Sequence, residues 1–127
     1  MALLAQTRAE RREIIELAAN IIDEQEREVA KMVEWRNGWF DGKPEAVNFQ
    51  FPGMAHGMKG MNMKKLETLK GREFDAEFVR QMIPHHEGAI EMAKAVINGN
   101  ARAELKELAQ DIITSQEAEI RQMRGWQ

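Results

Sequence analysis

Residues 104–126 read ELKELAQDIITSQEAEIRQMRGW, and residues 13–35 read EIIELAANIIDEQEREVAKMVEW. These stretches belong to a longer repeat, because residues 1–36 align with residues 92–127 at a constant offset of 91 without a gap. Fourteen of the 36 aligned pairs are identical. Two helices that share only their composition would not be expected to keep one register over roughly ten turns. We infer an internal duplication.

Both copies have the residue spacing of an amphipathic helix. Strong helix formers fill them, and neither proline nor glycine interrupts residues 2–37. In the second copy one stripe recurs at steps of three and four residues, and it comprises Leu105, Ala109, Ile112, Gln116, Glu119 or Ile120, and Met123. We therefore expect helices near residues 5–37 and 101–125.

The segment between the two copies divides into a loop and two further helices. Residues 38–62 hold two of the three prolines and five of the nine glycines, which predicts a loop. Asn62 is placed to cap a short helix over residues 63–70. Asp75 is placed to cap a helix over residues 75–98. The predicted fold class is all-α, an antiparallel bundle of three main helices plus one short helix.

The composition narrows the class of protein. A chain of 127 residues suits one domain, and no run approaches the roughly 18 apolar residues of a membrane helix. Eighteen Lys and Arg against 21 Asp and Glu give a net charge of -3 with interspersed signs, which argues against nucleic-acid binding. The absence of cysteine excludes disulfides, zinc-thiolate sites and cysteine nucleophiles.

The segment 75–98 contains two interlocking stripes, each with a histidine at its centre. The first stripe is Phe78, Met82, His85, Ala89, Met92 and Val96, and the second is Val79, Ile83, His86, Ile90, Ala93 and Ile97. Met82 precedes the two histidines by three and four residues, so its sulfur can reach the same point as an imidazole on the next turn. We predict one inward-facing metal site from Met82, His85, His86 and Met92. The alternative is a pair of core histidines, each hydrogen-bonded to a backbone carbonyl or to a glutamine such as Gln116.

Residues 54–63, MAHGMKGMNM, hold four of the nine methionines and the third histidine. Thioethers are soft, neutral ligands that suit Cu(I), and imidazole suits copper generally, whereas Ca, Mg and Mn prefer oxygen ligands. We predict a second copper site here, or a lid over the first, formed by Met54, His56, Met58, Met61 and Met63. The alternative is a flexible connector whose methionines fill the end of the bundle as adaptable apolar side chains.

Familiar catalytic patterns are not found. A di-iron carboxylate bundle uses Glu-x-x-His on two helices, but Met82 and Ile83 occupy the positions three residues before the two adjacent histidines. Ser115 is the only serine, and nothing places a histidine and a carboxylate beside it. No glycine-rich phosphate loop is present. We therefore expect a protein that is not an enzyme.

Residues 74–93, FDAEFVRQMIPHHEGAIEMA, and residues 108–126, LAQDIITSQEAEIRQMRGW, resemble the domain of unknown function 305 family. The resemblance spans nearly the whole chain, and the MIPHH core makes it specific. It implies a ferritin-like helical bundle, a bacterial extracytoplasmic location, either periplasmic or secreted, and, for some members, copper binding or copper tolerance. Its motif residues carry over onto Met82, His85, His86 and Met92, with His56 and its methionines as the loop between repeats.

Many members of that family have the His-His helix in both repeats, whereas here Met1 aligns with Met92. We therefore expect one domain over residues 1–127, in which residues 1–37 are the second helix of an incomplete first repeat and residues 63–127 form the second repeat. The apolar face of the first helix then lacks its partner. We expect a homo-oligomer that forms through this face.

Three functions follow from these observations. The leading hypothesis is a non-enzymatic protein that sequesters or transfers Cu(I) through methionine and histidine. The second is a helical oligomerisation or interaction module with structural core histidines and no metal. The third is a haem protein with histidine and methionine axial ligands.

Overall fold

The computed structural model describes residues 1–39 and 60–127, and everything said below about structure refers to these residues. They form helices without a strand, apart from an isolated bridge between Ala9 and Gly71. The helices are α1 (Ala2–Arg8), α2 (Arg12–Trp39), α4 (Met63–Thr68), α5 (Gly71–Asn98) and α6 (Ala103–Gly125). The predicted all-α helical fold is confirmed.

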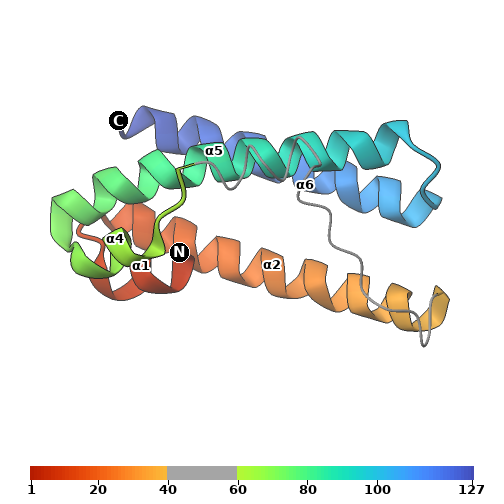
Figure 1. Ribbon diagram of the computed structural model, residues 1–127, viewed down its shortest axis with the longest axis horizontal. Coiled ribbons are helices and arrows are strands. Elements are labelled where there is room, and N and C mark those ends of the chain that lie inside the picture. Colours follow the sequence, from red (N-terminus) through yellow and green to blue (C-terminus); the bar gives the residue numbers. More distant parts are fainter. Residues whose placement is uncertain (40–59) are drawn as a thin grey trace.

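The axes of the three long helices are roughly aligned, and the two short helices lie together at one end of the molecule (Figure 1). α5 and α6 form an antiparallel hairpin with the most extensive contact in the molecule. α2 runs alongside in the direction of α5, and α1 and α4 lie at the end where α2 and α5 begin. None of the described helices is long and apolar enough to cross a membrane.

The prediction of a single helix over residues 5–37 is wrong at its start, because the helical conformation is interrupted between α1 and α2. Ala9 has an extended backbone, with φ of −70° and ψ of 145°. The carboxylate of Asp75 accepts the backbone N–H of Glu10 at 3.0 Å and that of Arg11 at 2.8 Å. Asp75 therefore caps the start of α2 from a neighbouring helix, and not its own helix, which begins four residues earlier at Gly71. The other predicted cap is correct, since the Asn62 side chain accepts the N–H of Lys65 at 3.1 Å.

The helix boundaries follow the offset of the sequence repeat. α2 begins at Arg12 and α6 begins at Ala103, 91 residues later. α1 aligns with residues 93–99, which include the last turns of α5. The α1–α2 hairpin is thus the counterpart of the end of α5 followed by α6, with a first helix of 7 residues where α5 has 28.

The core begins at the end where the short helices gather and continues between α5 and α6 as far as Ile90, Ala93 and Ala109. Phe74 and Phe78 are fully buried and stack with ring centroids 5.9 Å apart. Burial along α2 falls away after Ile21. Val29 and Met32 are 53% and 41% exposed, whereas their repeat counterparts on α6, Ile120 and Met123, are 7% and 0% exposed. The two copies therefore share a sequence pattern but not the same burial.

Candidate metal centre

His86 lies on the side of α5 that faces α6, and its side chain is 2% exposed. Its Nε2 atom is hydrogen-bonded to Oε2 of Glu119 on α6, which is itself buried. The Nδ1 atom is also buried, and no described residue provides it with a hydrogen-bond partner. One nitrogen of this imidazole is therefore fixed by a carboxylate, and the other is left without a partner.

A second carboxyl group extends this contact to α2. Glu24 is hydrogen-bonded to Glu119, so that side chains from α2, α6 and α5 form one chain ending at His86. Burial, followed by the hydrogen bond with Glu119 and its negative charge, raises the pKa of Glu24 to about 7. Burial and the charge of Glu119 also raise the pKa of Glu28, one turn further along α2.

These carboxylates do not form a site for a hard cation. The described residues contain no group of three or more His, Cys, Asp or Glu side chains arranged to hold a metal ion.

The other predicted ligands on α5 are less enclosed than His86, except for Met82. Met82 is 3% exposed, whereas His85 and Met92 are half-buried. His85 has polar contacts of its own and differs from His86 in burial. α5 thus presents the buried thioether of Met82 and the buried imidazole of His86 a turn apart, together with the half-buried side chains of His85 and Met92.

The predicted loop site falls largely outside the described residues. Met54, His56 and Met58 lie in the undescribed segment, and their role stays a prediction. Met61 is half-buried and Met63 is 37% exposed. These last two flank Asn62, whose position the structure does define.

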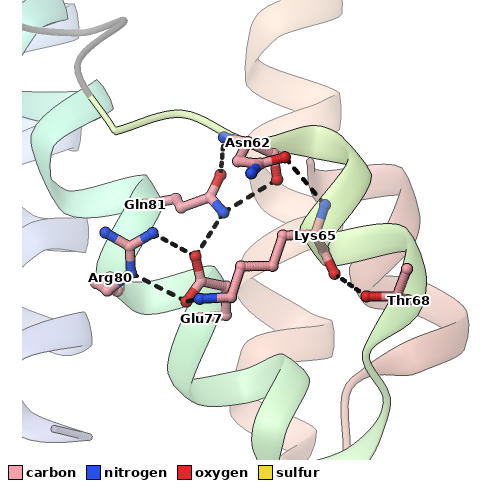
Figure 2. Close-up of polar contacts among 6 residues, drawn as sticks. All are labelled: Asn62, Lys65, Thr68, Glu77, Arg80 and Gln81. Carbon is pink, nitrogen blue, oxygen red and sulfur yellow. Dashed lines mark hydrogen bonds and ion pairs between the residues drawn. The ribbon is translucent and has the colours of Figure 1, made fainter.

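Asn62 is held against α5 by a pair of hydrogen bonds with Gln81 (Figure 2). The Asn62 backbone N–H donates to Gln81 Oε1 at 2.8 Å, and Gln81 Nε2 donates to the Asn62 carbonyl at 3.1 Å. Gln81 directly precedes Met82 in the sequence. The end of the methionine-rich stretch is therefore attached to α5 beside the first of the predicted ligands on that helix.

Glu77 supports this attachment from the preceding turn of α5. Its buried carboxylate accepts a hydrogen bond from Gln81 Nε2 at 2.7 Å, bonds to Arg80 Nε at 2.9 Å and pairs with Lys65 Nζ at 3.0 Å (Figure 2). The hydrogen bond with Arg80 is the largest cause that lowers the pKa of Glu77 to about 2, and those with Gln81 and Lys65 add to it against the effect of burial.

Glu119 is the residue that the sequence interpretation missed. Glu26 and Glu117, which are an identical pair in the two copies of the repeat, are both exposed and do not contact a histidine in this way. Gln116, the expected glutamine partner, has a buried Oε1 atom with no partner among the described residues. The available signal was the register of Glu119, which places a carboxylate in the apolar stripe of its helix.

The family described as Domain of unknown function (DUF305) matches residues 1–127. The chain belongs to this family. The predicted resemblance is confirmed. A curated relative, Uncharacterized protein L153 from Acanthamoeba polyphaga mimivirus, is 45% identical over 51 residues. This match spans 40% of the chain and about a third of the viral protein's length.

Solved structures of the same fold include CopM and a DUF305 protein from Streptomyces coelicolor. CopM in its Cu(I)-bound form is 40% identical, with a TM-score of 0.81 over 98% of this chain and 81% of the CopM chain. CopM has also been solved in Cu(II)-bound, Ag-bound and apo forms. A candidate secreted DUF305 protein from Streptomyces coelicolor is 28% identical, with a TM-score of 0.82 over 96% of this chain and 77% of that chain.

Proposed function

We propose that this protein binds copper as Cu(I) through methionine and histidine side chains and sequesters or transfers it without catalysing a reaction. The observation that carries the proposal is the buried Nδ1 atom of His86, which lacks a hydrogen-bond partner among the described residues and lies one turn from the buried thioether of Met82. A buried polar atom without a partner is rare, and a bound ion is one explanation for it.

The donor chemistry supports Cu(I) over other ions. Thioether and imidazole are soft and intermediate ligands that suit Cu(I), and α5 contains two of each within three turns. The described residues offer no cluster of oxygen ligands for a harder ion. The relative CopM, 40% identical over nearly all of this chain, has been solved with Cu(I), Cu(II) and Ag.

The ligands proposed on α5 are Met82, His85, His86 and Met92. His86 would bind through Nδ1, because Nε2 is already bonded to Glu119. A location outside the cytoplasm belongs to the same proposal, and the candidate secreted relative from Streptomyces coelicolor supports it.

A competition titration with a chromophoric Cu(I) chelator under reducing conditions tests this proposal. We expect the wild-type protein to take at least one equivalent of Cu(I) from the chelator and to bind Zn(II) more weakly. Paired substitution of Met82→Leu and Met92→Leu removes both thioethers while nearly keeping side-chain volume, and we expect it to weaken binding roughly tenfold or more. The matched control is Met32→Leu on the exposed part of α2, which is expected to change nothing.

The substitutions His85→Ala and His86→Ala together should lower the Cu(I) stoichiometry or affinity. Unchanged binding in both the methionine and the histidine variants would remove α5 from the proposed site. Because His86 is buried, the folded state of each variant is checked by circular dichroism before titration.

The second candidate function is a helical module that associates with copies of itself. The exposed side chains Val29, Met32 and Val33 on α2 favour it, because the α6 counterparts of the first two are buried. This alternative predicts that the histidine substitutions lower thermal stability and that added copper leaves both stability and assembly unchanged.

A further inference from the structure

A hydrogen-bonded chain of three side chains links the three long helices. Glu24 on α2 bonds to Glu119 on α6, and Glu119 bonds to Nε2 of His86 on α5. His86 and Glu119 are 2% and 7% exposed, so water contributes little to the arrangement. His86 is thereby held from one side only.

The hydrogen-bond donors and acceptors around His86 determine which of its two ring nitrogens carries the hydrogen. A carboxylate oxygen accepts hydrogen bonds, so Glu119 Oε2 takes the N–H of His86 Nε2. A proton on Nδ1 would bury a second donor without an acceptor, which is unfavourable. The arrangement therefore favours the His86 tautomer with its hydrogen on Nε2 and a lone pair on Nδ1.

We propose that Glu119 is a positioning residue for metal binding, which holds the Nε2–H of His86 and so presents Nδ1 as the ligand atom, with Glu24 bracing Glu119 from α2. This inference rests on the proposed function and adds to it a role for two carboxylates that do not touch the ion. A histidine ligand commonly donates its other N–H to a carboxylate, which fixes the ring orientation and increases the basicity of the ligating nitrogen.

The sequence repeat supplies a matched control for Glu119. Its counterpart at the offset of 91 is Glu28, a half-buried carboxyl group on α2. His86 hydrogen-bonds to Glu119 and not to Glu28. Glu119→Gln and Glu28→Gln therefore make the same chemical change at two related positions, and only the first changes the side chain that hydrogen-bonds to the imidazole.

Nitrogen-15 NMR of the histidine side chains tests the proposal directly, with Ag(I) as a redox-stable substitute for Cu(I). We expect apo wild-type protein to show His86 with its proton on Nε2. One equivalent of Ag(I) is expected to move the Nδ1 resonance while the Nε2–H signal persists. Glu119→Gln is expected to weaken Ag(I) and Cu(I) binding roughly tenfold or more, and Glu28→Gln to leave affinity within about twofold.

Four results would overturn the proposal. Loss of the Nε2–H signal when Ag(I) binds, or an unmoved His86 while methionine methyl signals respond to Ag(I), refutes it but leaves metal binding by the protein intact. A Glu119→Gln variant that melts at a lower temperature with unchanged affinity assigns Glu119 a structural role only. A folded wild-type protein with no response to Ag(I) or Cu(I) refutes the proposed function together with this inference.

Discussion

His86 and Glu119 meet across the contact between α5 and α6, with both side chains out of water. The periodicity of residues 75–98 was sufficient to predict that the histidine faces inward. It was not sufficient to predict the partner, because Glu119 is 33 residues away and its identity depends on how the two helices pack. A carboxylate within an apolar stripe was the local sign, and one helix pattern alone does not show what lies opposite it.

The raised pKa of Glu24 makes the stability of the folded protein depend on pH. Its pKa is raised from an ordinary 4.5 to about 7, so the folded protein holds this proton more tightly than the unfolded chain. The resulting stabilisation is complete below pH 4.5 and is lost as the pH rises through about 7. We therefore expect Glu24→Gln, which stays neutral, to reduce the fall in melting temperature between pH 5 and pH 8.

The groups that face Glu24 are Glu119 from α6 and Glu28 and Arg27 from its own helix. Glu28 has a raised pKa and contributes with the same sign, so some pH dependence is expected to remain in the variant. Glu26→Gln, at an exposed position on α2, serves as the control and should match the wild type. A Glu24→Gln variant with the full wild-type pH dependence would show that the Glu24–Glu119 contact does not hold the proton.

At the scale of the elements, helix identity was easier to predict than helix ends. The 3.6-residue period and the cap at Asn62 gave α4, α5 and α6 to within a few residues at most ends. The break between α1 and α2 was missed, because no proline or glycine marks it. It depends on Asp75, which is more than 60 residues away in sequence and takes the backbone N–H groups of Glu10 and Arg11.

The attachment of α4 to α5 depends on Glu77. Glu77→Gln removes the charge that pairs with Lys65 and Arg80, while these two remain about half exposed and can be solvated. We therefore expect a loss of about 2 kcal/mol in the free energy of unfolding at pH 7, measured by urea denaturation. Glu73→Gln, at an exposed position on the same helix, should cost less than about 0.5 kcal/mol.

The same carboxylate gives α5 a pH dependence opposite in sign to that of Glu24. The folded-state pKa of Glu77 is lowered from 4.5 to about 2, so its stabilisation is present above pH 4.5 and is lost as the pH falls toward 2. Wild-type protein should therefore lose stability more steeply than Glu77→Gln over this interval. Parallel curves for the two proteins would contradict the contacts drawn in Figure 2.

For the whole molecule, the repeat predicted two related helical segments but not their unequal burial. The outer half of α2 exposes Val29, Met32 and Val33, and we expect self-association through this face. Sedimentation of the wild-type protein should show a dimer or larger species that Val29→Glu converts to monomer. Leu3→Glu, at a 72% exposed apolar position on α1, is the control and should leave the assembly unchanged. A wild-type protein that stays monomeric at high concentration would contradict this prediction.

The fold and the family followed from periodicity and from one specific motif, whereas the coordination of an ion depends on side-chain geometry that a sequence pattern does not define. The four predicted ligands on α5 differ in burial, which the two sequence stripes did not show. His86 and Met82 are buried, whereas His85 and Met92 are half-buried. The proposed function therefore depends on whether copper binds and on which side-chain atoms hold it.

X-ray absorption at the copper edge of Cu(I)-loaded wild-type protein tests the central claim most directly, because it identifies the atoms bound to the ion. We predict both sulfur and imidazole nitrogen in the first coordination sphere, as expected for ligation by methionine and histidine. A spectrum with nitrogen or oxygen neighbours and no sulfur, or a protein that retains no copper after desalting, would contradict the account.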